Sequence, residues 1–387
     1  MYDWLIIGGG VHGVTMATYL IKSGKTTAQK LAIIDPYPSP LWKWKQNTTR
    51  IKMPYLRSPS VHQLDPDPFG LEAFAKKNGY SSCNHFYGRY DRPSLSLFNE
   101  HCDHLYSELQ LKDYWIQGKV CTLSRIENLN AWKATLNSGT TIVSKQVILA
   151  VGLSDQPYYP DWAAPLKQQG IPVHHIFEDH LPALVPDITI IGGGITAAHY
   201  AIRLANEYPG KVTLLSRHSF RIHKFDSEPG WLGPKNMRQF NRTSCYIERR
   251  NMIKNARHKG SMPKELYTKL MYAEKKGLLS IIVDEPVAVN EVNGTIFIAL
   301  KDKSFLKTKS LVLATGFLPT LPHWLLHTVQ TEILPCATCG YPIVSPETLE
   351  WKKNLFVMGA LAELEIGPVA RNIAGARRAA ERILKAT

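Results

Sequence analysis

The sequence is poor in cysteine, with six in 387 residues. A chain of this length is not a small disulfide scaffold, because such scaffolds are short and dense in cysteine. Long apolar runs are also missing, since no window approaches the roughly 18 residues that a membrane-spanning helix needs. No basic segment followed by an apolar one precedes the first predicted strand, so we expect no cleaved secretory signal. These absences predict a cytoplasmic globular protein with no membrane span.

Acidic residues are scarce relative to basic ones: Asp and Glu number 32 against 46 Lys and Arg, which gives a net charge of +14. Such an excess favours acidic ligands, either nucleic acid or small phosphorylated molecules. The densest basic segment, residues 247–260, contains no zinc-finger, RRM or homeodomain pattern, and we interpret it as a solvated helix and loop. We therefore expect small phosphorylated ligands and no nucleic acid.

A glycine pattern follows the first predicted strand. Gly8, Gly10 and Gly13 have GxGxxG spacing between an apolar strand and a helical pattern. The first glycine permits a tight turn, the second lets the backbone approach a pyrophosphate, and the third lets the helix pack on the strand. About 20 residues later a second apolar strand ends on Asp35, whose carboxylate can accept hydrogen bonds from ribose hydroxyls. This combination predicts a dinucleotide-binding domain.

The same arrangement recurs about 180 residues later in the chain. Gly192, Gly194 and Ala197 occupy the three positions, with alanine at the third. The strand that follows ends on Ser216 and Arg217. Two such phosphate cradles predict two nucleotide-binding domains.

The two strand ends carry opposite charge, and this predicts two different dinucleotides. A carboxylate accepts hydrogen bonds from a ribose 2′-hydroxyl and repels a 2′-phosphate, whereas an arginine does the reverse. Asp35 therefore suits the unphosphorylated ribose of FAD, while Ser216 and Arg217 suit the 2′-phosphate of NADPH. The alternative for Arg217 is a surface arginine at a strand end.

Two further apolar strands, in residues 146–160 and 310–322, end in a small residue, any residue and glycine. They contain Gly152 and the pair Thr315-Gly316, where a bulky side chain would collide with a bound dinucleotide. Their placement predicts that one domain is split by the other. We expect an α/β fold of two Rossmann-like three-layer dinucleotide-binding domains, the NADPH domain inserted in the FAD domain. The predicted FAD domain spans residues 1–160 and 318–387, and the predicted NADPH domain spans residues 161–317.

The last segment predicts a strand, then Gly359, then a helix that opens at Gly367 and Pro368 and runs almost to the final residue. Proline is favoured in the first helical turn because its missing N–H is not needed there. The positive end of this helix suits the pyrimidine edge of a reduced, anionic flavin, and Asn372 could reach the same region. The alternative is a helix that only caps the domain.

With these motifs on both cradles, the chain resembles the class B flavoprotein monooxygenases, most closely the ornithine/lysine N-hydroxylase branch. The similarity spans nearly the whole chain and includes two less general stretches, residues 50–79 with 90–105 and residues 216–229. The resemblance implies that NADPH reduces FAD, that dioxygen forms a C4a-hydroperoxyflavin, and that a small soft nucleophile, such as an amine or amino acid, takes one oxygen atom. Pro54 and the IGPVARN segment before the last helix depart from the family pattern, so the amino-acid substrate stays open.

The loop that follows Asp35 supplies other candidates. Trp44 could wall the flavin or pack in the core, and Asn47 and Arg50 could bond to the flavin. Arg57 could orient a substrate carboxylate or contact NADP⁺, or it could be a structural arginine.

Cys336 and Cys339 form a CxxC pair. They could be a redox disulfide, half of a zinc site, or two incidental thiols, and we expect the last because the pair follows the second glycine cradle. The pair nevertheless keeps open a second hypothesis, a flavin-dependent NADPH reductase of disulfides or quinones that does not oxygenate. A flavoprotein that acts on nucleic acid through its basic face is a third hypothesis.

Overall fold

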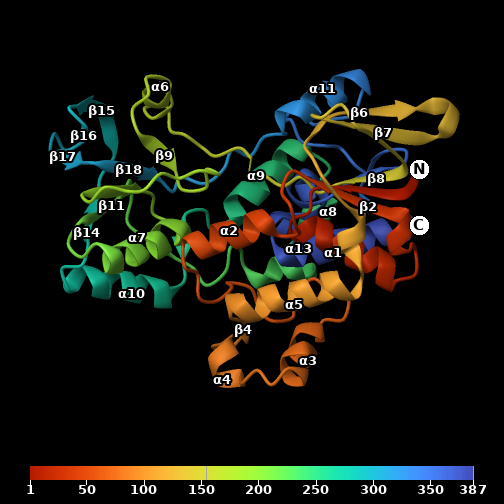
Figure 1. The fold of residues 1–387 in the computed structure, drawn as a ribbon, viewed down its shortest axis with the longest axis horizontal. Helices are drawn as coiled ribbons and strands as arrows, with labels where there is room; N and C mark the ends of the chain where they lie inside the picture. Colours follow the sequence, from red (N-terminus) through yellow and green to blue (C-terminus); the bar gives the residue numbers. More distant parts are fainter. Residues whose placement is uncertain (154, 387) are drawn as a thin grey trace.

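The protein folds around two separate parallel β-sheets, which lie toward opposite ends of the long axis of the molecule (Figure 1). The computed structural model describes residues 1–153 and 155–386, without the side chains of residues 82 and 83. Its helices are α1 (Val11–Lys22), α2 (Trp42–Arg50), α3 (Gly70–Lys77), α4 (Ser82–His85), α5 (Leu95–Glu108), α6 (Ala164–Gln168), α7 (Ile195–Glu207), α8 (Pro234–Arg242), α9 (Tyr246–Ala256), α10 (Lys264–Lys275), α11 (His323–Thr331), α12 (Glu363–Ile366) and α13 (Ile373–Ile383).

The first sheet has the strand order β19-β20-β8-β1-β2-β5, and a hairpin of β6 and β7 joins it through β8. Its core strands β1, β2, β8 and β20 pair in parallel. Both faces of β1 are covered over its last four residues, which form a continuous buried apolar run rather than an alternating one. The strands are β1 (Tyr2–Ile7), β2 (Leu31–Asp35), β5 (Trp115–Gln117), β6 (Val120–Ile126), β7 (Ala131–Leu136), β8 (Thr141–Leu149), β19 (Glu350–Lys352) and β20 (Leu355–Val357).

The second sheet has the order β14-β11-β10-β18-β9, and all of its pairings are parallel. Helices α7 and α10 cover one face, and a small antiparallel sheet of β15, β16 and β17 lies toward the other (Figure 1). Its strands are β9 (Val173–His175), β10 (Ile188–Ile191), β11 (Val212–Ser216), β14 (Ser280–Val283) and β18 (Ser310–Leu313). The remaining strands are β3 (Phe86–Tyr87), β4 (Arg92–Pro93), β12 (Arg221–Ile222), β13 (Ser261–Met262), β15 (Pro286–Val292), β16 (Thr295–Leu300) and β17 (Phe305–Thr308).

Both ends of the chain build the first sheet, and its middle builds the second. Strands β19 and β20 join β8, whereas every strand of the second sheet lies between residues 173 and 313. The chain crosses between the sheets twice, and the two crossing segments pair where Pro157 meets Phe317. The limits at residues 160 and 318 stay predictions. Within the described residues, no helix combines the length and the apolar character that crossing a bilayer requires.

Helices α8 and α9 pack differently from what the predicted domain limits suggest. They fall within residues 161–317, yet Met237, Phe240 and Ile253 belong to the same buried cluster as β1. The prediction of a solvated helix and loop in residues 247–260 holds for only part of the segment: Glu248 and Lys254 are exposed, but Arg249 and Arg250 are only 9% and 8% exposed. These two guanidinium groups face inward because they have carboxylate partners there.

Those partners are Glu363 and Glu365, which are 1% and 5% exposed. Arg249 Nη1 lies 2.6 Å from Glu365 Oε1, and Arg371 Nε lies 2.7 Å from Glu363 Oε2. Arg250 also pairs with Glu363. Burial raises the pKa of Glu365, and the charge of Arg249 opposes that shift. These ion pairs connect α9 to the segment that precedes the last helix.

The last helix begins later than predicted. Pro368–Arg371 forms a short 3₁₀ turn, and α13 starts at Ile373. Asn372 stands between them with an extended backbone (φ −99°, ψ 168°) and makes no side-chain cap bond. This extended residue separates the two helical pieces, so the prediction that the helix opens at Gly367 and Pro368 is wrong.

We expect Glu363→Gln to lower the free energy of unfolding by about 3–5 kcal/mol in urea denaturation, because it leaves buried arginines without a charged partner. The matched control is Glu127→Gln. Glu127 accepts from Arg125 at 3.0 Å, but its side chain is 77% exposed. The control should therefore cost less than about 1 kcal/mol. Equal losses in the two variants would contradict a stabilising role for the buried network.

Candidate functional site

The first glycine turn is built by close approach of three stretches of backbone. Gly8 has φ +108°, and a Cβ there would lie 2.4 Å from the carbonyl oxygen of Ala150. A Cβ on Gly13 would lie 1.8 Å from the oxygen of Gly8. Gly10 differs, because nothing in the described protein lies within 4 Å of an added Cβ. The turn is therefore tightly packed behind and open in front, where α1 begins.

Asp35 stands at the end of β2 beside this opening. Its carboxylate accepts from the backbone N–H of Gly9 at 2.6 Å and of Tyr37 at 3.0 Å. Burial raises the pKa of Asp35, and these two hydrogen bonds oppose the rise. The carboxylate is thus fixed in place, and its remaining lone pairs are available to a ribose hydroxyl.

A pocket connects Asp35 with the glycine turn and with the start of α2. Gly8, Gly10, Asp35, Trp44 and Gly152 line it, as predicted from the sequence. Gly13 packs behind the turn instead.

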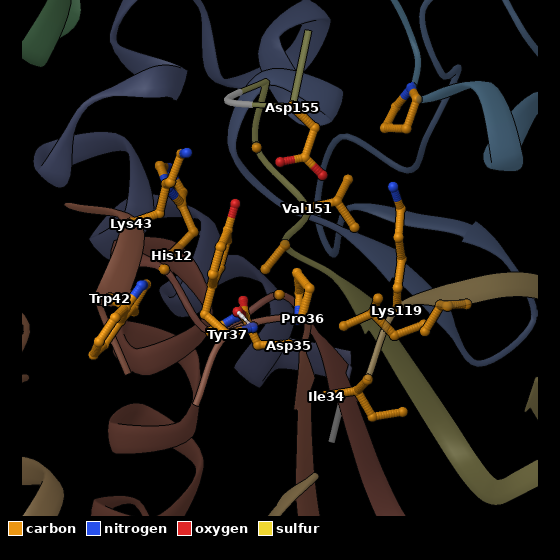
Figure 2. A pocket seen from close by; sticks show the side chains of 18 of the residues that line it. His12, Ile34, Asp35, Pro36, Tyr37, Trp42, Lys43, Lys119, Val151 and Asp155 are labelled. Atoms are coloured by element: carbon orange, nitrogen blue, oxygen red, sulfur yellow. Dashed lines mark hydrogen bonds between the residues drawn. The ribbon is translucent and has the colours of Figure 1, made fainter. Parts of the chain in front are cut away.

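The sequence analysis did not predict several other residues that line this pocket. Figure 2 shows Tyr37, Asp155 and Lys119 around one open space, with His12 and Lys43 nearby. Their only sequence signal was nearness to the motifs, since His12 lies within the glycine pattern and Tyr37 lies two residues after Asp35.

His12 connects the pocket to the last segment of the chain. Its Nε2 lies 2.9 Å from the carbonyl oxygen of Ala370, so Nε2 carries the hydrogen and Nδ1 the lone pair. Burial lowers the pKa of His12, so we expect a neutral imidazole at neutral pH. A Cβ added at Gly359 would lie 3.4 Å from this ring, and the contact of Gly359 with the cofactor stays a prediction.

The three residues of helix α2 that were predicted to contact the flavin have different surroundings. Trp44 lines the pocket, and its Nε1 donates to Asn99 at 3.1 Å. Asn47 has a buried Oδ1 with no hydrogen-bond partner among the described residues, and the same is true of Oε1 of Gln46. Arg50 is directed elsewhere: it donates to the carbonyl oxygens of residues 176 and 178, both at 2.6 Å. Arg50 does not line the first pocket, and its contact with the flavin stays a prediction that these bonds do not favour.

The residues of the first pocket fit FAD. Gly10 offers an open approach and Asp35 a fixed acceptor, and both line the pocket. Asn47 lies further along α2, outside the pocket lining, with a buried oxygen that lacks a partner among the described residues. Such an atom is costly to leave without a partner, so flavin binding by Asn47 stays a prediction, and Asp35 would serve the ribose end.

The second cradle repeats the packing of the first. A Cβ on Gly192 would lie 2.7 Å from the carbonyl oxygen of Ala314, and Ala197 is fully buried against the turn. Gly194 faces Gly260, whose Cα lies 3.3 Å from the position of an added Cβ. The loop before β13 therefore flanks this cradle.

The two residues at the end of β11 differ in burial and in hydrogen bonding. Ser216 is 1% exposed and donates its hydroxyl to the carbonyl of His218 at 2.7 Å, so it shapes the turn behind Gly193. Arg217 is exposed, and it makes no ion pair or hydrogen bond with the residues that the structure describes. Of the two, Arg217 is therefore the residue available to a phosphate.

Several residues that were predicted to bind a cofactor make hydrogen bonds or close contacts within the protein. The hydroxyl of Thr315 donates to the carbonyl of Tyr158, and the carbonyl of Gly316 accepts from the N–H of Tyr158 at 2.9 Å. An added Cβ on Gly367 would lie 3.2 Å from Sδ of Met237. Pro368 accepts from Arg257 at 2.8 Å. These residues lie in crossing and supporting segments, and direct flavin contact at Gly367, Pro368 and Asn372 stays a prediction.

Arg57 is a structural clamp in this structure. Its guanidinium donates to Asp226 at 2.6 Å, to the carbonyl oxygens of residues 223, 224 and 225, and to Ser261 at 3.0 Å. With its side chain 12% exposed and its donors occupied, it has little to offer a substrate carboxylate. These contacts favour the structural alternative, in which Arg57 positions the loop after β12, and a role toward substrate or NADP⁺ stays a prediction.

The CxxC pair lies in a tight turn against the first core. Cys336 and Cys339 are half-buried free thiols. Burial raises the pKa of Cys336, so its thiolate is scarce at neutral pH. Neither cysteine lines the first pocket.

Residues 5–154 match a protein-family model described as FAD-NAD(P)-binding. The match includes the first cradle, Asp35 and α2, so this part of the chain is similar to FAD-NAD(P)-binding domains. The chain is also 23% identical over 324 residues to the uncharacterized oxidoreductase CzcO of Bacillus velezensis, a match that covers 82% of this chain and 81% of that protein.

Solved structures match the whole chain. The ornithine N-hydroxylase of Kutzneria sp. 744, in a complex with reduced FAD, NADP⁺ and L-ornithine, has a TM-score of 0.79 at 15% identity, covering 100% of this chain and 98% of that one. A bacillithiol disulfide reductase from Staphylococcus aureus has a TM-score of 0.64 at 14% identity, covering 100% and 97%. At these identities the likeness confirms the predicted fold, the α/β arrangement of flavoproteins with two dinucleotide-binding domains. Together with the family match, it supports an FAD-dependent oxidoreductase.

The variant Gly10→Ala should affect FAD binding without affecting the stability of the fold. Gly10 has φ −76°, which alanine adopts freely, and the added methyl group meets no protein atom. We expect unchanged thermal stability of the apoprotein and at least about a tenfold loss of FAD affinity, or about 1.4 kcal/mol, in a fluorescence titration. The control is Gly79→Ala, at a position of positive φ that also faces open space. A fully yellow Gly10→Ala protein with wild-type affinity would contradict the pyrophosphate assignment.

Arg217→Ala should weaken NADPH by about 1.5–3 kcal/mol, the loss of a charge-assisted contact, and leave NADH nearly unchanged. Stopped-flow reduction of the flavin over a range of coenzyme concentrations measures both affinities. The control is Arg242→Ala, which removes another exposed arginine. Equal losses with NADPH and NADH would overturn the assignment of Arg217 to the 2′-phosphate.

Proposed function

We propose that this protein is an FAD- and NADPH-dependent monooxygenase that transfers one oxygen atom from dioxygen to a small soft nucleophile, with N-hydroxylation of an amine or amino acid as the leading activity. The observation that carries the proposal is the match of the whole chain to the ornithine N-hydroxylase fold. The opposite strand-end charges of Asp35 and Arg217 agree with it, because they suit one nucleotide without a 2′-phosphate and one that has it.

When bound, the flavin would accept two electrons from NADPH and activate dioxygen, one atom of which goes to the substrate while the other leaves as water. The task of the chain is then to hold both nucleotides and to keep water away from the reacting atoms. Asp35 fixes the ribose end of FAD, and Arg217 recruits the phosphate of NADPH. Trp44 and neutral His12 add surface without charge to the first pocket.

The acceptor must offer a free lone pair, so an amine substrate must lose its proton before it reacts. The described residues of the first pocket include no metal cluster and no serine nucleophile, in keeping with chemistry supplied by the flavin.

A second candidate function is reduction of a disulfide or quinone without oxygenation. The bacillithiol disulfide reductase match and the pair Cys336/Cys339 favour it. The raised pKa of Cys336 and its position outside the first pocket argue against thiol chemistry at the flavin.

A panel of amines, amino acids and thiols separates the two functions. For its own substrate class, the monooxygenase should form nearly one hydroxylated product per NADPH consumed, as measured by mass spectrometry and NADPH absorbance. Cys336→Ser should change this turnover less than twofold, and so should the control Cys121→Ser at an exposed thiol. Peroxide as the only oxygen product across the panel, together with loss of turnover in Cys336→Ser alone, would refute the proposal in favour of the reductase.

A further inference from the structure

Two loops beside the second cradle bring together three side chains that the proposed function does not use. His223 follows β12, Glu228 precedes the 3₁₀ turn Pro229–Leu232, and His258 follows α9. One nitrogen of each histidine and one carboxylate oxygen of Glu228 all lie within 4.8 Å of one another. Nε2 of His258 is 3.6 Å from Glu228 Oε1. Two imidazoles and a carboxylate are the donor set with which proteins bind Zn²⁺ and similar divalent ions.

The ring of His258 is oriented for coordination. Its Nδ1 lies 3.0 Å from the carbonyl oxygen of Phe225, so Nδ1 carries the hydrogen and Nε2 has the lone pair. Metal-binding histidines characteristically donate their second ring nitrogen to such a carbonyl, which fixes the tautomer.

The backbone that carries both histidines is held firmly. The N–H of His223 donates to Met262 at 3.0 Å, and the N–H of His258 donates to Asp226 at 2.8 Å. Arg57 binds the carbonyl oxygens of His223 and Phe225. The two loops therefore form one cross-linked unit, and little backbone ordering remains to oppose binding of an ion.

In the structure the two imidazole rings stack, with centroids 3.7 Å apart and planes 20° from parallel. The stacked rings would have to turn apart for a nitrogen of each to bind one ion. Glu228 can follow this movement, because its side chain is 67% exposed. The charge of nearby Arg57 is balanced by its ion pair with Asp226, which limits repulsion of a cation.

We propose that His223, His258 and Glu228 form a binding site for one divalent transition-metal ion of the Zn²⁺ class, with a fourth position open to water or an anion. The site borders the second cradle: Gly260, two residues after His258, is the residue that faces Gly194. A bound ion would add one more link between the loop before β13 and the loop after β12, along one wall of that cradle. This proposal does not depend on which substrate the enzyme oxygenates.

The test uses the full chain with FAD bound, expressed without a polyhistidine tag, stripped with a chelator and dialysed. Zn²⁺ is then titrated in competition with a chromophoric chelator. We expect one saturable site per chain. Glu228→Gln and His258→Ala should each weaken it at least about tenfold, since loss of even an outer-sphere partner costs that much. The matched control, His327→Ala, removes an exposed histidine of α11 and should leave the affinity unchanged.

FAD content and the thermal midpoint of each variant, measured without metal, show whether it is folded. Should His258→Ala lose its FAD, the exposed Glu228→Gln still decides the question. Absence of stoichiometric Zn²⁺ binding by the wild-type protein, or binding that persists unweakened in folded Glu228→Gln, would overturn the proposal.

Discussion

The arrangement of this molecule depends on one constraint, the close approach of backbone at the carboxyl end of each parallel sheet. An added Cβ on Gly8 would lie 2.4 Å from the carbonyl oxygen of Ala150, and one on Gly192 would lie 2.7 Å from that of Ala314. In both sheets the turn after the central strand touches the end of the neighbouring strand. The chain leaves each sheet at these same neighbours, so the crossing segments start where the nucleotides bind. Ligand binding and domain connection therefore share one edge, as the switch-point rule for parallel sheets requires.

The sequence was sufficient for the features that this constraint imposes. Parallel strands buried on both faces give continuous apolar runs, and close approach demands glycine or alanine, so both cradles and both strand-end charges could be predicted. The roles of Arg50 and Arg57 could not be predicted in this way. An arginine has five donors, and any backbone carbonyl satisfies them. Arg57 finds its acceptors in residues 223–226, and no local pattern indicates a contact across that distance in sequence.

The excess positive charge has a similar explanation. Arg249 and Arg250 belong to a segment that looks solvated in sequence, yet both are buried against the carboxylates of Glu363 and Glu365. Part of the basic character of the chain therefore lies inside the protein and is neutralised there. Helix α9 becomes a bridge from the inserted segment to the first core, and composition alone cannot reveal such an inward orientation.

The two strand-end residues also differ in how much freedom binding removes. Asp35 is held by two backbone N–H groups before any ligand arrives, so it offers a fixed acceptor and pays no side-chain entropy on binding. Arg217 is exposed and free, and a long flexible side chain carries about 2 kcal/mol of rotamer entropy. A preorganised site favours tight retention, whereas a site that must be ordered on each encounter lowers affinity and favours exchange. This difference suits a flavin that stays bound and a nicotinamide coenzyme that must leave after each turnover.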